Sequence, residues 1–185
     1  MNSAARNLGI PVPRAMGMHS SSLVRLLIAG GLVALSGAVG ASTATATFKV
    51  NASVAAQCNV AAADLNFAAV DPIGGNVDQS TTVTVKCTKN SPYTVGLNAG
   101  TTTGATIAQR LMANGADTMQ YNLYTDTTRA TIWGNTAAAP SWVSGTGAGL
   151  GTPQVLTVYG RVPTGQTNLA VGSYQENTIT VTVTY

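Results

Sequence analysis

From about residue 42 onward the sequence predicts an all-β fold, a β-sandwich. Several short segments alternate apolar and polar residues with a period of two, and Gly-, Pro- and Asn-rich turns separate them. Helix signals are nearly absent, because no apolar period of 3.6 continues over three turns. Short strands without intervening helices pack as two layers of sheet. No internal repeat or linker divides the chain, so we expect one domain.

The strands are predicted where this alternation is clearest. In the first one, apolar side chains alternate with Lys, Asn and Ser at Phe48, Val50, Ala52 and Val54. In the last one they alternate with threonines at Ile179, Val181, Val183 and Tyr185. Between these lie predicted strands at residues 83–87, 93–97, 119–124 and 155–162. The turns between strands are predicted at residues 71–75, 90–92, 114–115, 145–151 and 163–165.

Residues 1–41 have the pattern of a secretory signal peptide. Arg6, Arg14 and Arg25 precede an apolar run at residues 26–39, and small residues follow it. Cleavage after residue 41 or after residue 46 would fit the small residues there. The run is shorter than the roughly 20 residues that a membrane-spanning helix needs, so we expect no membrane span in the mature chain.

The net charge gives no reason to expect binding to nucleic acid. The three leader arginines account for the whole formal excess of +3, and six Lys and Arg then face six Asp and Glu. Proteins that bind phosphates need clustered cations, and the mature chain has none. The two cysteines, Cys58 and Cys87, would meet an oxidising compartment after export, so we expect a disulfide between them. Closing a loop of roughly 30 residues restricts the unfolded chain, which stabilises the folded state by about 3–4 kcal/mol in the loop-entropy description.

The residues needed for catalysis or metal binding are missing from the mature sequence. The single histidine, His19, lies in the leader, which excludes Ser-His and Cys-His relays and His-rich metal sites. The glycines of 145–151 lack the spacing of a phosphate loop and predict a flexible loop instead. We therefore predict no enzyme, no cofactor and no metal. Arg161 is predicted to pair with Asp126 and to anchor a loop.

The aromatic residues admit two interpretations. Ordinary packing in the core and across strands is the favoured one, and an exposed surface for adhesion or sugar binding is the alternative. The residues concerned are Tyr121, Tyr124, Trp133, Trp142 and Tyr159.

The two terminal strands suggest how copies of the chain could join. The first strand directly follows the predicted cleavage site, and the last strand runs to residue 185, with nothing after it to cover its outer edge. A spare apolar strand at the front can complete a neighbour that lacks one, which is β-strand addition used as a polymer joint. The alternative is a self-contained secreted coat or carbohydrate-binding module, in which the first strand folds onto its own sandwich.

The sequence also resembles a known family, the spore coat protein U domain. The resemblance covers essentially the whole mature chain, in order. The motifs that carry it are Phe48-x-Val50, Leu65-Asn66-Phe67, Asp71-Pro72, residues 83–87, Tyr93-x-Val95-x-Leu97, residues 121–126, Trp133-Gly134, residues 159–163, Gly165-Gln166, residues 172–174 and residues 181–185. It departs from the family pattern at residues 67–72 and 174–177, which bears on the subunit type.

This resemblance implies a structural role. Members resemble the subunits of archaic, Csu-type chaperone-usher pili, with an incomplete immunoglobulin-like sandwich. Such subunits are held by a periplasmic chaperone, polymerise with identical or related pilin subunits at an outer-membrane usher, and reach the cell surface as a fimbrium with a role in adhesion or biofilm formation. By that resemblance, residues 42–54 are the donor segment with plugs Phe48, Val50, Ala52 and Val54, and residues 55–185 form the sandwich. The last strand, with Ile179, Val181, Val183 and Tyr185, is then the acceptor edge.

Overall fold

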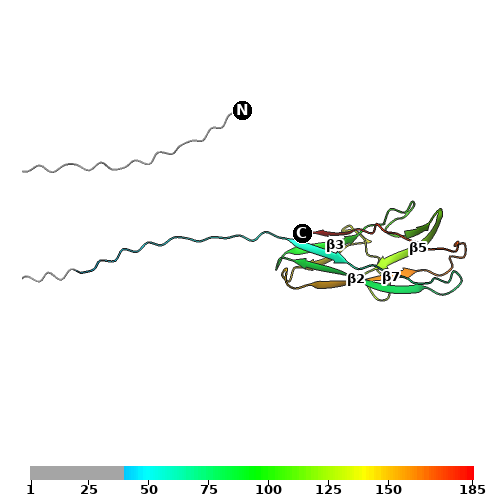
Figure 1. Ribbon diagram of the computed structural model, residues 1–185, viewed down its shortest axis with the longest axis horizontal. Coiled ribbons are helices and arrows are strands. Elements are labelled where there is room, and N and C mark those ends of the chain that lie inside the picture. The colour runs from blue at the N-terminus through cyan, green and yellow to red at the C-terminus, as the bar shows by residue number, and fades with distance from the viewer. Residues whose placement is uncertain (1–39) are drawn as a thin grey trace, which may run out of the picture. The chain divides into compact units, whose positions relative to one another are not determined.

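The computed structural model describes residues 40–185, and all of its strands lie in the compact unit Val50–Tyr185 (Figure 1). The predicted leader falls almost wholly outside the described residues. Within residues 40–185 no helix forms, and accordingly none is long and apolar enough to cross a membrane. The fold class is therefore all-β, as the sequence predicts.

Eight strands form two antiparallel sheets. The larger sheet has the order β1-β2-β7-β5-β4 and curls like half a barrel, while the smaller has the order β6-β3-β8. The strands are β1 (Cys58–Ala62), β2 (Val77–Cys87), β3 (Pro92–Leu97), β4 (Arg110–Asn114), β5 (Asp117–Tyr124), β6 (Val143–Thr146), β7 (Gln154–Val162) and β8 (Val181–Thr184).

Five of the predicted strands are present with shifted ends. β2 is longer than predicted because Val77–Thr82 also pair with β7, and β8 is shorter because only Val181–Thr184 pair with β3. Sequence reasoning missed β1, β4 and β6. The predicted loop at 145–151 is wrong at its start, since Gly145 pairs with Tyr93 inside β6 and β3. A side chain at residue 145 would collide with the Tyr93 ring, so the glycine makes room for that ring.

The predicted strand at residues 48–54 does not form in the single chain. Phe48, Val50 and Val54 are 87%, 82% and 85% exposed, and Ala52 is exposed as well. A period-two segment becomes a half-buried strand only when a sheet edge pairs with it, because the strand supplies no hydrogen-bond partners of its own. These residues therefore form an exposed apolar segment that pairs with no strand in the single chain.

The core lies between the two sheets. Its buried members include Val83, Val85, Val95, Leu97, Tyr121, Leu123, Trp133, Val158 and Val162. Tyr121 and Trp133 confirm the packing interpretation of the aromatics, while Tyr124, Trp142 and Tyr159 are half-buried. The predicted disulfide is present: Cys58 and Cys87 face each other across β1 and β2.

A fully buried arginine fastens several strands together. Arg110 on β4 donates to the carbonyl oxygens of Leu97, Asn98 and Trp133, and to Oδ1 of Asn122, at 2.6–3.0 Å. Burial lowers the pKa of Arg110 to about 10, which keeps the guanidinium charged at neutral pH. Backbone carbonyls satisfy this charge without an acidic partner, so Arg110 joins β3, β4 and β5 to the residues around Trp133.

Candidate functional site

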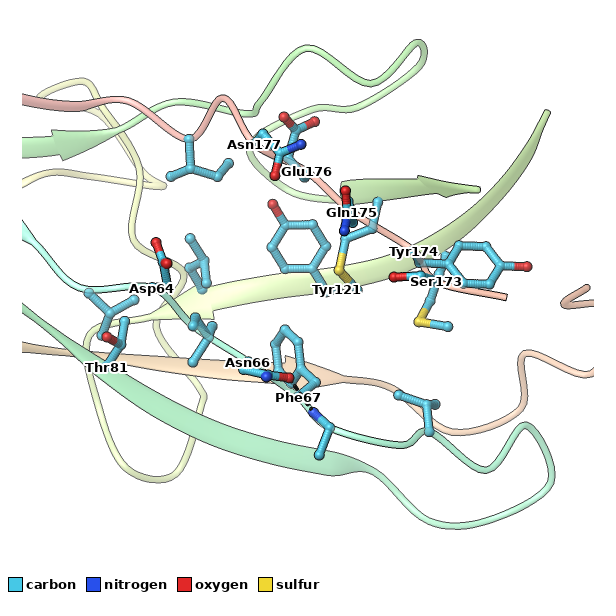
Figure 2. Close-up of a pocket in the computed structure, with 18 of the residues that line it drawn as sticks. Asp64, Asn66, Phe67, Thr81, Tyr121, Ser173, Tyr174, Gln175, Glu176 and Asn177 are labelled. Carbon is cyan, nitrogen blue, oxygen red and sulfur yellow. Dashed lines mark hydrogen bonds between the residues drawn. The ribbon is translucent and has the colours of Figure 1, made fainter. Parts of the chain in front are cut away.

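The sandwich contains an open groove of about 990 Å³. One wall is the stretch that follows β1, residues 62–72, and the other is the stretch that leads into β8, residues 169–181. Figure 2 shows Phe67 inside the groove near Tyr121, opposite the segment that carries Glu176. The floor comes from both sheets and is apolar: Val83, Leu97, Met119, Tyr121, Leu123 and Val158.

Both walls contain apolar side chains that the chain itself covers only in part. These half-buried residues are Leu65, Val70, Met112, Leu169, Tyr174, Ile179 and Val181. At the bottom of the groove Phe67 meets Tyr121 edge to face, with ring centroids 6.1 Å apart. Burial raises the pKa of Tyr121 above its ordinary value, so its hydroxyl stays neutral. The groove is therefore suited to apolar side chains.

The walls of the groove continue from two edge strands. β1 is one edge strand of the larger sheet and β8 is one edge strand of the smaller, each with a single paired neighbour. After β1, one more backbone hydrogen bond joins the chain to β2, in which Ala63 N donates to Thr82 O at 3.0 Å. A strand edge carries unpaired N–H and C=O groups that can accept a further strand. The same site thus offers backbone partners along its rims and apolar pockets between them.

The second wall is held in place by Glu176. Its carboxylate accepts hydrogen bonds from the backbone N–H groups of Thr101, Thr102 and Thr178, at 2.9–3.1 Å, and from the hydroxyls of Thr102 and Thr178. Partial burial opposes ionisation, but the hydrogen bonds from Thr178 and Thr102 outweigh it and lower the pKa of Glu176 to about 2. Gly100 has φ +84° beside this carboxylate, where a Cβ would lie 2.6 Å from Glu176.

Two further contacts fix the same wall. Gln175 and Ala113 exchange both backbone hydrogen bonds at 3.0 Å, which ties the wall to β4. The side chain of Asn98 donates to Thr178 O at 3.1 Å and accepts from Thr180 N at 2.8 Å. The groove is therefore largely formed before anything binds in it, which lowers the ordering cost of binding.

The predicted acceptor-edge residues divide between two places. Ile179 and Val181 line the groove, and Val183 lies on β8 against β3. Tyr185 lines a second, smaller cavity. Sequence reasoning missed the opposite wall as part of the site. Leu65 and Phe67 alternate around Asn66, which is the signal that could have indicated it.

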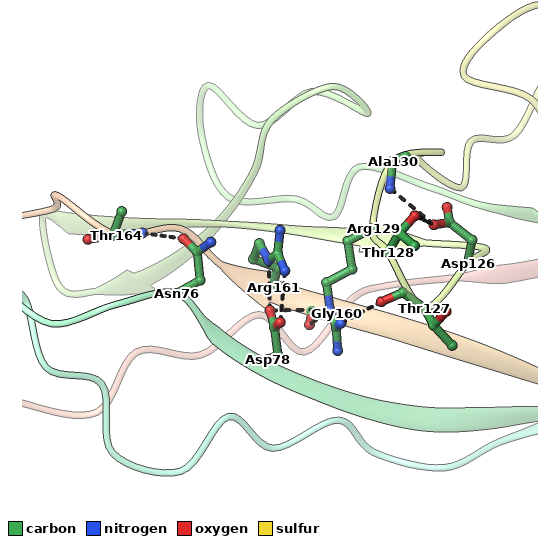
Figure 3. A network of polar contacts seen from close by, with 10 residues as sticks. All are labelled: Asn76, Asp78, Asp126, Thr127, Thr128, Arg129, Ala130, Gly160, Arg161 and Thr164. Carbon is green, nitrogen blue, oxygen red and sulfur yellow. Dashed lines mark hydrogen bonds and ion pairs between the residues drawn. The ribbon is translucent and has the colours of Figure 1, made fainter.

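A polar network on the larger sheet corrects the predicted Arg161–Asp126 pair (Figure 3). Arg161 instead forms a bidentate pair with Asp78, with N–O distances of 2.7 and 2.8 Å, because the register of β2 and β7 places the two residues opposite each other. That hydrogen bond lowers the pKa of Asp78. Asp126 accepts from Thr128, Ala130 and Thr131 in its own loop, and these bonds lower its pKa.

The groove contains little that could perform chemistry. Among residues 40–185 no three His, Cys, Asp or Glu side chains lie close enough together to hold a metal ion. The acidic residues in its lining are Asp64 and Glu176, and Glu176 is engaged in holding the wall. The groove is open and has an apolar floor between two walls.

Comparison with known proteins agrees with this geometry. The Spore Coat Protein U domain matches residues 44–184, which include both walls of the groove and the residues from Phe48 onward. The chain belongs to the spore coat protein U domain family. This family is generally non-enzymatic.

Two relatives show how far the likeness extends. Protein U of Myxococcus xanthus is 33% identical over 189 residues, covering 92% of this chain and all of that protein. A chain in the crystal structure of the CsuC–CsuE chaperone–tip adhesion subunit pre-assembly complex, from the archaic chaperone-usher Csu pili of Acinetobacter baumannii, superposes with a TM-score of 0.52 at 22% identity. The match covers 71% of this chain and 40% of that one, so it shows that this spore coat protein U domain shares the fold.

Proposed function

We propose that this protein is a structural subunit of a surface fibre, without enzymatic activity, and that copies polymerise by strand donation. The apolar segment of one copy, residues 42–54, lies in the groove of the next and completes its sandwich, which is incomplete and immunoglobulin-like. The observation that carries the proposal is the presence on one chain of two features. One is an open groove with an apolar floor, whose walls continue from two edge strands, and the other is an exposed apolar segment with strand periodicity.

The pattern of the segment fits the groove. Phe48, Val50, Ala52 and Val54 project to one side of an extended strand, while Lys49, Asn51 and Ser53 project to the other. The apolar side would fill the spaces between the walls, and the backbone would pair with the edges on both sides. Burying Phe48, Val50 and Val54 contributes about 1.5–3 kcal/mol each.

Before assembly, the groove needs a temporary occupant. We propose a periplasmic chaperone that lends a strand and an outer-membrane usher at which subunits exchange it, after export directed by the leader. The shared fold with a chain from a chaperone–subunit complex supports this order of events. Adhesion or biofilm formation at the cell surface is the role proposed for the fibre.

A self-contained coat or sugar-binding module is the competing interpretation. It requires the front segment to occupy the groove of its own chain, whereas residues 50–57 are exposed and form no strand. This observation favours donation to a second copy.

The test is an unheated SDS gel of the assembled protein. The wild type should give a ladder that collapses on boiling, and a variant lacking residues 43–54 should give only monomer. Val50→Asp should also abolish the ladder, because a carboxylate in the apolar groove is costly. Asn51→Asp, one residue further along and facing away, should leave it intact. A monomer band for the wild type, or equal effects of the two aspartates, would refute strand donation.

A further inference from the structure

The end of the sandwich at which β1 begins holds the chain at Gln57, just after the front segment. Thr88, directly after β2, donates its backbone N–H to Gln57 O at 2.9 Å, and its hydroxyl accepts from Gln57 N at 3.0 Å. The neighbouring disulfide joins Cys58 to Cys87. The front segment therefore leaves the sandwich at Gln57, at what we call the donor end.

The connection between two joined subunits must be short. Val54, the last plug, precedes Gln57 by three positions, with only Ala55 and Ala56 between them. An extended chain covers at most about 3.6 Å per residue, so the connection reaches roughly 11 Å. A neighbour whose groove holds Val54 consequently lies against the donor end, and surfaces at this end belong to the junction.

An apolar cavity of about 390 Å³ lies at this donor end. Its lining includes Pro92, Trp142 and Tyr185, with the neutral side chains of Thr94, Ser144 and Thr184. Pro92 begins β3 just after the turn that holds Gln57, and Tyr185 follows β8, whose end pairs with the beginning of β3. In Figure 1 the end of β8 and the start of β1 lie at the same end of the sheets. We call this cavity the aromatic pocket.

Two exposed apolar side chains lie at the opposite end. Ile73 is 83% exposed and Val171 is fully exposed. Ile73 precedes β2, whose 11 residues extend over roughly 36 Å to Cys87. Val171 lies next to Gly172, where a Cβ would lie 2.3 Å from the side chain of Asn114 at the β4–β5 hairpin. The groove itself reaches this end, because Pro72 and Val171 line it. We call it the acceptor end.

A subunit that both donates and accepts needs room for two neighbours. If the donated strand left the groove at the donor end, both neighbours would compete for the same surface. The strand must therefore leave the groove at the acceptor end, which brings the acceptor end of one copy against the donor end of the other.

On the basis of the proposed function, we propose that the aromatic pocket of the donating copy receives Ile73 and Val171 of the accepting copy. This second contact at each junction buries apolar side chains that a threonine-rich, nearly neutral surface otherwise leaves in water. The pocket lining carries no charged side chain that would oppose the contact. The contact restrains the angle between successive subunits, which the short connection through Ala55 and Ala56 alone leaves variable.

Disulfide trapping tests this contact. In the assembled fibre, Ile73→Cys combined with Ser144→Cys should form a disulfide under mild oxidation, because a cysteine pair needs Cα atoms within about 7 Å. Val171→Cys with Ser144→Cys is a second pair, which tests the same contact if the first double variant fails to fold. The matched control is Ile73→Cys with Ser80→Cys, since Ser80 is exposed in the middle of β2, away from the junction.

The outcomes of the trapping experiment distinguish the pocket contact from strand donation. A ladder that survives boiling and disappears with reductant in both pocket pairs, with monomer in the control, is the expected result. An unheated ladder without trapping in either pocket pair, or with equal trapping in the control, overturns the pocket contact and leaves strand donation standing. A wild type without any unheated ladder overturns both proposals.

Discussion

Truncating the first plug, Phe48→Ala, gives the most direct quantitative test of the groove. Phe48 is 87% exposed on the single chain, so almost its whole side chain is available for burial at a junction. Burial of a Phe side chain contributes about 1.5–3 kcal/mol, and large-to-small changes at filled sites cost about 3–5 kcal/mol. We expect the junction to lose about 2–3 kcal/mol, which corresponds to roughly a 30- to 140-fold weaker contact.

The effect should be seen in the rate at which fibres release monomer, because most changes in affinity act on dissociation. Fibres are held in SDS at fixed temperature, and samples are taken over time onto an unheated gel. Lys49→Ala is the matched control, since its side chain lies on the opposite side of the same strand. Equal release rates for the two variants would refute the assignment of Phe48 to the groove.

Three further predictions concern other parts of the molecule. Trypsin should cut the free subunit at Lys49, the only Lys or Arg between the leader and Lys86, and should leave the fibre uncut; mass spectrometry of the products checks this. Arg110→Met should lower the free energy of unfolding by about 3 kcal/mol or more, because several buried carbonyl oxygens lose their donor; denaturant titration measures it. Glu176→Gln should lower the melting temperature at pH 7, and the difference from the wild type should shrink as the pH falls below the unfolded value of about 4.5 and vanish near pH 2.

The sign of the last prediction follows from the depressed pKa. The folded state binds the proton of Glu176 less tightly than the unfolded state does, so ionised Glu176 stabilises the fold above pH 4.5, and this contribution is lost on acidification toward pH 2. A difference that does not depend on pH would contradict it. Cutting of fibres at Lys49 as fast as of monomer would contradict the first prediction. Arg161→Met, which removes a partly exposed surface pair, is the control for Arg110→Met. It should lower the free energy of unfolding by about 1 kcal/mol or less.

The sequence by itself determined the features that depend on local pattern. Period-two alternation located β2, β3, β5, β7 and β8, and the two cysteines of an exported chain predicted the disulfide. Asn114-Gly115 predicted the tight turn of the β4–β5 hairpin, where Gly115 has φ +62°. In each case a few adjacent residues contain the whole signal.

Only the tertiary structure decided which segments meet across long separations. β1, β4 and β6 have weak alternation and become strands because β2, β5 and β3 pair with them. Arg161 meets Asp78, 83 residues away, because of the register of two strands. Arg110 links distant parts of the chain because three separate segments present oxygens to it. The groove likewise has walls about 100 residues apart in the chain, so no local pattern marks it as a site. Burial and pairing are properties of the folded neighbourhood, and a residue's neighbours in space are not its neighbours in sequence.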